Sequence, residues 1–503
     1  MRAQFGTRSE AMNVCRKLAD VVLSAGLVLS GAAMVFPAPL MAQGQKSADR
    51  AVKREAVGLV EKQRAEMVRM SDLIWGYAET ALKEVRSAKL LADYAQQQGF
   101  RVTRGVAGMP TAFVAEYGEG RPILAILGEY DALPGISQKA TTQKEPLEAG
   151  AAGHGCGHNL FGVASLAAAT AVKELIAQGK LRGTIRFYGT PAEEAVGGKA
   201  YMIREGLFND VDIALAWHPD DETKADVDSS QAMVDMAVEF RGKTAHAAFD
   251  PWNARSAVDA MELLTHGLNM LREHVKPTVR IHYTIQRGGD VPNVVPDYAR
   301  LWLWVRDSKR AGVEEVLPRV RRMVEGAAMM AGVEGKLTVQ AGSWEMNANL
   351  AGARVLDANL QWLGPIGFTE EEQQFARAIQ RNSGMAEQGL KGQPESWREP
   401  LANPPGGSTD VADVSWVVPT LHLNVTTGAA GAPWHAWPTV ATGGMSIGHR
   451  GMMYAGKVLA ATLVDLFEQA ETRVAIRAEF EQKTRGVTYK GYIPEGPPPV
   501  PKD

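Results

Sequence analysis

Apolar runs in this chain end repeatedly in short polar groups. Ile123–Leu127 is uninterrupted, as expected of a strand buried on both faces. An alanine-rich segment, Leu160–Ala177, has the length and composition of a buried helix, and the alternation of strands with helices predicts a largely parallel sheet. Polar groups follow four predicted strands: GEYD after Ile123–Leu127, PAEE after Thr184–Tyr188, WHP after Ile213–Ala216, and the WH pair at 434–435 after Leu421–Val425. Since ligands bind beyond the carboxyl ends of such strands, we expect these groups to share one site.

The pattern changes between residues 231 and 342, where the predicted order is β-α-β-β-α-β, that of a ferredoxin-like unit. The strands are predicted at Ala232–Phe240, Thr278–Gln286, Tyr298–Val305 and Lys336–Gln340, and the helices at Ala254–His274 and Val313–Met330. The sequence therefore predicts an α/β protein with a mainly parallel-sheet catalytic domain (47–230 and 343–475), into which a ferredoxin-like lid or dimerisation domain (231–342) is inserted.

Both ends of the chain are expected to lie outside these domains. Val21–Phe36 is apolar, follows Arg16 and Lys17, and is shorter than the roughly 20 residues that span a bilayer. We interpret residues 1–42 as a secretory signal, which predicts a periplasmic or secreted protein without stable membrane association after its removal. Residues 476–503 are interpreted as a C-terminal tail whose proline-rich end, PEGPPPVPKD, is expected to be disordered. The net charge of −3 gives no electrostatic indication of nucleic-acid binding.

The segment His154-Gly-Cys-Gly-His158 carries the chemistry that a metal-dependent hydrolase needs. The chain has only two cysteines, and Cys15 lies in the predicted signal, so Cys156 would be the single thiol of the mature protein. At the start of a helix, Cys156 and His158 can both point at one ion, which would keep the thiol ionised. The alternative is a glycine-rich turn with incidental histidines, and His154 is assigned only to the surroundings of the site.

Glu193 and Glu194 follow a predicted strand, where one carboxylate can ligate a metal while the other takes a proton from water. An isolated pair of glutamates would more often be a solvated surface feature. His218 and His435, taken alone, would more often be hydrogen-bonded core residues. Together with Cys156 and His158, these residues favour a metal site.

These motifs resemble the M20 family of metallopeptidases and amidohydrolases, and most closely its p-aminobenzoyl-glutamate hydrolase group (the B-type subunits of that enzyme). The resemblance rests on GEYDALPG, GHGCGHNLFG, PAEE, WHP, GSTDVADVSW and the HAW segment at His435, and it covers about Val57 to Gln469. It implies that Cys156 bridges two divalent metals, zinc or manganese. The other implied ligands are His158, Glu194, His218 and His435.

The resemblance also implies roles for other residues. Glu193 would be the general base, and His246 would stabilise the oxyanion in the site of the partner subunit of a homodimer. Asn293 and Arg306 would hold the substrate. Many relatives have a histidine-x-aspartate motif where this chain has Glu129-Tyr-Asp131, so we interpret Glu129 and Asp131 as groups that orient the ligands.

The sequence thus predicts a metal-dependent amidohydrolase for N-aroyl or N-acyl amino acids such as p-aminobenzoyl-glutamate. A dipeptidase and a hydrolase of aryl-acetyl amino acid conjugates are alternatives within the family. A cysteine hydrolase with Cys156 as nucleophile would leave Glu194 and His218 unexplained. A non-catalytic metal-binding scaffold is the remaining alternative, and a second, different subunit stays possible as partner.

Overall fold

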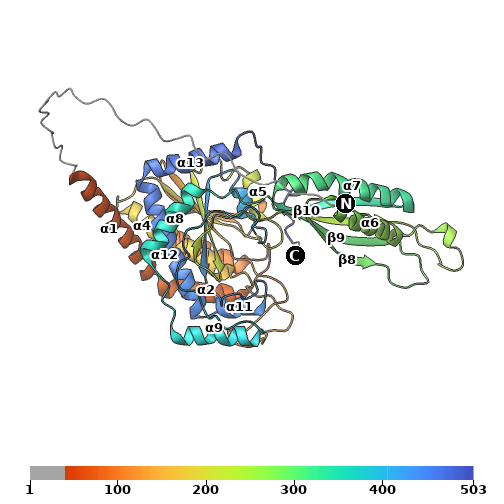
Figure 1. The fold of residues 1–503 in the computed structure, drawn as a ribbon, viewed down its shortest axis with the longest axis horizontal. Coiled ribbons are helices and arrows are strands. Elements are labelled where there is room, and N and C mark those ends of the chain that lie inside the picture. The colour runs from red at the N-terminus through yellow and green to blue at the C-terminus, as the bar shows by residue number, and fades with distance from the viewer. Residues whose placement is uncertain (1–39, 405, 502–503) are drawn as a thin grey trace, which may run out of the picture. The chain divides into compact units, whose positions relative to one another are not determined.

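The computed structural model describes residues 40–404 and 406–501, and the chain divides into two compact units, Met1–Lys46 and Ser47–Asp503. The predicted signal therefore lies almost wholly outside the described residues. The second unit contains two β-sheets, each with its own hydrophobic core. Figure 1 shows helices packed around the larger sheet and a smaller sheet with two helices.

The larger sheet has seven strands in the order β1-β2-β4-β3-β5-β11-β6. Its central strands β4, β3, β5 and β11 are parallel, as predicted, whereas β1, β2 and β6 pair antiparallel, so the sheet is mixed. The short connection between β1 and β2 explains part of this difference, because a parallel pair needs a longer crossover. The strands are β1 Arg101–Arg104, β2 Phe113–Gly118, β3 Ile123–Gly128, β4 Thr184–Gly189, β5 Ile213–Asp220, β6 Lys224–Ala225 and β11 Thr420–Thr426.

The helix predicted at Leu160–Ala177 is α4, His158–Ala177, and it is apolar on all sides because it packs against α12, α2 and strands of the sheet. By length and composition α4 could cross a membrane, but most of its residues are buried inside the protein. The other helices of this part are α1 Leu40–Lys62, α2 Arg64–Tyr77, α3 Val85–Gln97, α5 Gly198–Arg204, α8 Leu350–Leu363, α9 Glu370–Asn382, α10 Val411–Val414, α11 Trp437–Gly443, α12 Ser446–Glu468, α13 Ala470–Thr484 and the 3-10 turn η1 Val106–Gly108.

The smaller sheet is antiparallel, with the order β10-β7-β9-β8, and the chain passes through it as β-α-β-β-α-β. Alternate residues of β7 and β9, such as Val234, Leu301 and Leu303, are buried against α6 and α7. The opposite side chains of these strands point away from the two helices. The elements are β7 Ala232–Arg241, η2 Pro251–Asn253, α6 Ala257–Leu271, η3 Arg272–His274, β8 Arg280–Gly288, β9 Tyr298–Asp307, α7 Arg310–Ala331 and β10 Glu334–Ser343.

Residues 486–501 contact the rest of the chain, and they include the described part of PEGPPPVPKD, the end whose composition predicts disorder. The indole Nε1 of Trp344 donates to the carbonyl of Lys490 at 3.1 Å, and the ring of Tyr489 lies 5.0 Å from that of Trp344. Arg204 donates to the carbonyl of Gly496 at 2.8 Å, and Pro498 is buried. The aromatic side chain of Tyr489, just before this end, supplies the apolar surface for the contact with Trp344.

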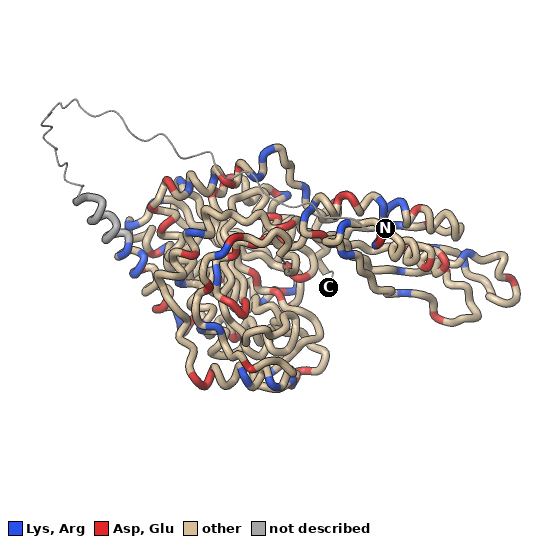
Figure 2. The backbone as a smooth tube through the Cα atoms, viewed as in Figure 1, with Lys and Arg blue, Asp and Glu red and all other residues tan. Residues whose placement is uncertain are grey.

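Acidic and basic residues alternate over the described part of the chain (Figure 2). This distribution agrees with the small net charge of −3.

Candidate metal centre

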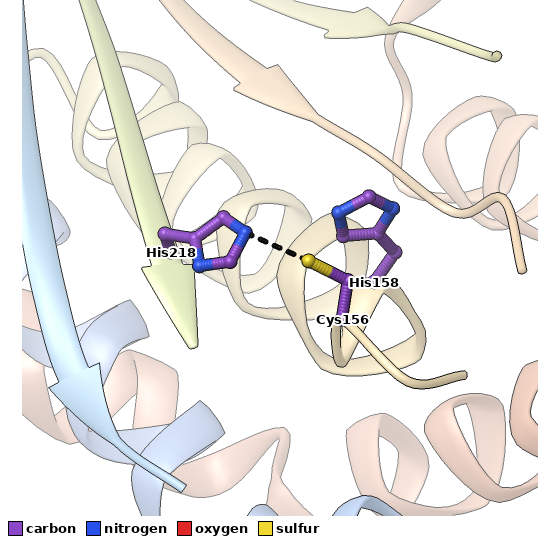
Figure 3. A group of neighbouring side chains, drawn as sticks. All are labelled: Cys156, His158 and His218. Atoms are coloured by element: carbon purple, nitrogen blue, oxygen red, sulfur yellow. Dashed lines mark hydrogen bonds between the residues drawn. The ribbon is translucent and has the colours of Figure 1, made fainter. Parts of the chain in front are cut away.

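The turn before α4 brings Cys156 and His158 to one point. Gly157 between them has a φ of +71°, a left-handed conformation that glycine adopts without strain. A Cβ atom at this position would also lie 2.9 Å from Cβ of Pro219. One ligand atom from each of Cys156, His158 and His218 lies within 4.8 Å of the others. Figure 3 shows these three side chains beside one another at the start of α4 and the end of β5.

His218 comes from the carboxyl end of β5, and its ring is prepared to bind a metal through Nε2. The Nδ1 atom donates to the carbonyl of Pro219 at 2.6 Å, and Nε2 lies 3.3 Å from Sγ of Cys156. Burial lowers the pKa of His218 to about 3, so the ring is neutral. A neutral imidazole whose other nitrogen is hydrogen-bonded to a carbonyl is the usual form of a metal-ligating histidine.

Cys156 also belongs to a second group of potential ligands, with Glu194 and His435, whose atoms again lie within 4.8 Å of one another. Nε2 of His435 lies 3.5 Å from Oε2 of Glu194. The backbone of His435 has a φ of +56°, and its N–H donates to the carbonyl of Gly155 at 2.9 Å. A left-handed conformation at a non-glycine residue is held by its surroundings and is typical of functional sites. The five predicted ligands thus form two groups that meet at Cys156.

Glu129 and Asp131, at the end of β3, both contact His158. Oδ1 of Asp131 lies 2.9 Å from Nδ1 of His158, and Oε2 of Glu129 lies 3.0 Å from Nε2. Burial disfavours the charged ring, but Glu129, Cys156 and Asp131 outweigh it and raise the pKa of His158 well above its usual value. Asp131 also accepts from the backbone N–H of Glu194 at 2.9 Å, so this one carboxylate positions residues from both ligand groups.

Lys199, the second residue of α5, is a buried member of the site that the sequence analysis missed. Its ammonium lies 2.6 Å from Oε1 of Glu129 and 2.5 Å from Oδ1 of Asp410. Glu129, His158 and Glu193 form a further group of potential ligands. Because Lys199 already supplies a positive charge to Glu129, this third group needs no metal ion.

Glu193 lies beside the ligand groups without belonging to the two that share Cys156. Burial, followed by the neighbouring charges of Glu129 and Glu194, raises the pKa of Glu193 well above its usual value. Burial also raises the pKa of Glu194, to about 7. The preceding residue, Ala192, has a φ of +61°, and its backbone N–H donates to the buried Glu84 at 2.9 Å. This turn holds the two glutamates at the carboxyl end of β4.

A cavity of about 580 Å³ opens beside Glu193, Glu194 and His435. Its other wall comes from the smaller sheet, with Asp235 of β7 and Trp304 of β9 among the lining residues. A pocket of this size with a few polar groups is typical of a small-molecule site.

The structure does not bring His246 and Asn293 to this cavity. Both lie in exposed loops of the smaller sheet, where the N–H of Ala247 donates to the carbonyl of Asn293 at 3.0 Å. Arg306, at the end of β9, is half-buried, and its guanidinium stacks 4.7 Å from the ring centroid of Trp304. His154 contacts the carbonyl of Ile74 at 3.0 Å and belongs to neither ligand group.

Comparison with known proteins identifies the family. Residues 125–352 match peptidase family M20/M25/M40. The chain is 38% identical over 470 residues to the B subunit of p-aminobenzoyl-glutamate hydrolase from Escherichia coli K12, an alignment that covers 88% of this chain and 97% of that protein. The chain belongs to peptidase family M20. It is therefore a hydrolase of the amidohydrolase kind, as the sequence predicted.

Two further M20 relatives show the breadth of the family. Xaa-Arg dipeptidase of Homo sapiens is 28% identical over 437 residues, which cover 82% of this chain and 88% of that protein. The crystal structure of a dinuclear metal-binding M20 peptidase from Bacillus subtilis matches with a TM-score of 0.55 at 18% identity, covering 81% of this chain and 99% of that one. The second likeness shows the fold alone.

Proposed function

We propose that this M20 chain is a metal-dependent amidohydrolase that cleaves N-aroyl or N-acyl amino acids. The observation that carries the proposal is that the five candidate ligands form two groups that share the sulfur of Cys156. Two adjacent cations with one common ligand would fill this arrangement. The 38% identical relative is named for p-aminobenzoyl-glutamate, which makes an aroyl glutamate the first substrate to test.

The residues fit a pair of divalent metals. Oε1 of Glu194 is buried without a hydrogen-bond partner, although Glu194 faces other potential ligands. Burial and then the charge of Glu194 raise the pKa of the Cys156 thiol, so a neighbouring cation would be needed to ionise it. Thiolate, imidazole and carboxylate together suit zinc, and manganese is compatible with such mixed sites.

The residues would have separate roles in the catalytic step. Bound metals would supply positive charge that polarises the scissile carbonyl and makes water easier to deprotonate. Glu193 would then take a proton from the attacking water and pass it to the leaving amine, because a raised pKa suits a group that must hold a proton between two steps. Asp131 would keep His158 and Glu194 oriented through its two oxygens.

The first test is release of the amine from p-aminobenzoyl-glutamate by the purified protein, with added zinc or manganese and with a chelator. We expect release that the chelator abolishes and that thiol alkylation of the metal-loaded protein does not. Release that survives the chelator but is lost on alkylation would instead make Cys156 a nucleophile. If a metal-containing protein released no amine, the activity would be that of a dipeptidase, like the 28% identical Xaa-Arg dipeptidase, or the protein would be a non-catalytic metal-binding scaffold.

We also propose that two copies associate through the smaller sheet, so that His246 of one copy serves the site of the other. Exposed apolar side chains surround His246 in this region, including Phe249 at 79% and Trp252 at 72% exposure. Apolar surface of this kind marks association sites. A different subunit is the alternative partner, since the Escherichia coli relative is named as one subunit of a hydrolase.

The dimer is tested by mixing two variants, Glu193→Gln and His246→Ala, each expected to be inactive alone. If His246 acts across the interface, reassorted dimers should recover about a quarter of wild-type activity, because half of them are mixed and one of their two sites is complete. Recovery is measured after exchange of subunits and checked by the mass of the mixed dimer. Mixed dimers without activity would show that His246 serves its own subunit or none.

We also infer that the protein is exported to the periplasm or the medium, because residues 1–42 are predicted to be a secretory signal. Detection of the processed chain in the periplasmic fraction would test this inference.

A further inference from the structure

The open face of the smaller sheet carries aromatic side chains where it meets the cavity. Along β9, Leu301, Leu303 and Val305 are buried against the helices, so the alternate residues Trp302 and Trp304 point the other way. Both tryptophans line the cavity, and their rings are 5.8 Å apart at 81°. Trp302 keeps 39% of its surface exposed, so its ring is accessible to a ligand.

Asp235 of β7 is next to both tryptophans. It is the cross-strand partner of Trp304, and its Oδ1 accepts from the indole Nε1 of Trp302 at 2.6 Å. Only 6% of its surface is exposed, yet it lines the cavity and forms no ion pair among the described residues. Burial raises the pKa of Asp235 to about 6, and the two indoles oppose this effect.

Other polar atoms in the same wall also lack partners. The hydroxyl of Ser343 has no hydrogen-bond partner although the residue is 4% exposed, and Oε1 of Gln340 is buried and unpaired. Both residues line the cavity. Buried polar atoms normally find a partner, so an unpaired group of them beside a cavity indicates a ligand with matching polar groups.

The charge of the cavity decides which half of a substrate can lie there. The described lining includes Glu193, Glu194, Asp235 and Asp410, but neither a lysine nor an arginine. Asp410 is paired with Lys199, and Glu194 is a candidate metal ligand, so Asp235 is the carboxylate that would repel a substrate carboxylate at this wall. We therefore place the acyl group against Trp302 and the acidic half of an N-acyl amino acid away from Asp235.

We propose that Asp235, Trp302 and Trp304 form the acyl-group subsite, and that this subsite selects an aromatic acyl group bearing an N–H donor. The inference rests on the proposed amidohydrolase function and narrows its substrate class. The indoles provide apolar faces for a ring, and Asp235 and Gln340 provide acceptors. The donor is either a neutral aryl amine or a cationic ammonium. Both can donate a hydrogen bond to a carboxylate, and both can pack against the face of a tryptophan ring.

The test compares kcat/KM for p-aminobenzoyl-glutamate, 4-(aminomethyl)benzoyl-glutamate and benzoyl-glutamate. The wild-type protein should prefer an N–H-bearing substrate to benzoyl-glutamate by about tenfold or more, because a buried acceptor left unpaired is costly. A preference for p-aminobenzoyl-glutamate would identify the donor as the neutral amine, and a preference for 4-(aminomethyl)benzoyl-glutamate would identify it as the ammonium. In Asp235→Asn the side-chain oxygen can still accept from Trp302, but its other end becomes a donor. The preference, which is the ratio of the two kcat/KM values measured on the same variant, should fall to about one, mainly through KM.

The matched control is Glu239→Gln. Glu239 lies on the same strand and face, also accepts from an aromatic residue (the Tyr298 hydroxyl, at 2.6 Å), and does not line the cavity. It should keep the wild-type preference. An unchanged preference in Asp235→Asn, or wild-type preference for benzoyl-glutamate, would overturn the subsite.

A failure of the subsite can be told from a failure of the proposed function. If the wild-type protein hydrolyses none of the three substrates, the function fails, and the subsite is then tested by tryptophan fluorescence with p-aminobenzoate, 4-(aminomethyl)benzoate and benzoate. Tighter binding of either N–H-bearing ligand than of benzoate, lost in Asp235→Asn, supports the subsite. Equal binding of all three would overturn it.

Discussion

Glu193→Gln should lower kcat by about 10²–10⁴-fold, the usual contribution of a general base. The glutamine has the shape of the glutamate but cannot accept a proton from water. Because Glu193 lies outside the two ligand groups that share Cys156, metal content should remain that of the wild type. The change is measured as amine release from p-aminobenzoyl-glutamate at saturating substrate, with metal content determined on the same sample.

The comparison variant is Cys156→Ser, which removes the ligand common to both groups and should lose metal and activity together. A Glu193→Gln protein that also loses metal would assign Glu193 to a metal and not to proton transfer. A Glu193→Gln protein that retains most of its turnover would require a different base.

The sequence indicated which candidate ligands would lie together, because most of them stand beside an element whose end is visible in the residue pattern. Apolar runs end shortly before Glu194 and His218, and the glycines around Cys156 mark the turn before a helix. Since β3, β4, β5 and β11 are parallel neighbours, their carboxyl ends meet at one edge and bring these residues together. Residues far apart in sequence thus become neighbours through topology alone.

Other residues of the site could not be predicted, because their positions depend on contacts between residues far apart in the sequence. Lys199 is a single lysine near the start of a short helix, a position that is usually exposed, and only the folded chain places it between Glu129 and Asp410. The alternation of YARLWLWVRD does indicate two outward tryptophans, but it cannot indicate that Asp235 lies across the strand from Trp304.

Lys199→Met should destabilise the protein by about 3–5 kcal/mol, the usual effect of removing one partner of a buried ion pair. Lys199 and Glu129 have side chains that are 0% and 1% exposed, and Asp410 is 3% exposed. Without the ammonium, two carboxylates would be left close together in the interior, with only the His158 ring beside Glu129 to offset their charge. Methionine has a similar volume, so the loss reflects charge more than packing. The free energy of unfolding is measured by denaturant titration of the metal-free protein.

The control is Lys391→Met, which breaks the ion pair with Glu222 at 2.5 Å, where the side chains are 37% and 30% exposed. Solvent screens that pair, and its loss should cost about 1 kcal/mol or less. In the double variant Lys199→Met/Asp410→Asn, one of the unpaired charges is removed, so part of the stability should return. If Lys199→Met were no more destabilising than Lys391→Met, Glu129 would have to be protonated in the native state. His158 would then face a neutral carboxyl at Glu129, and the charge balance derived for the site would be incorrect.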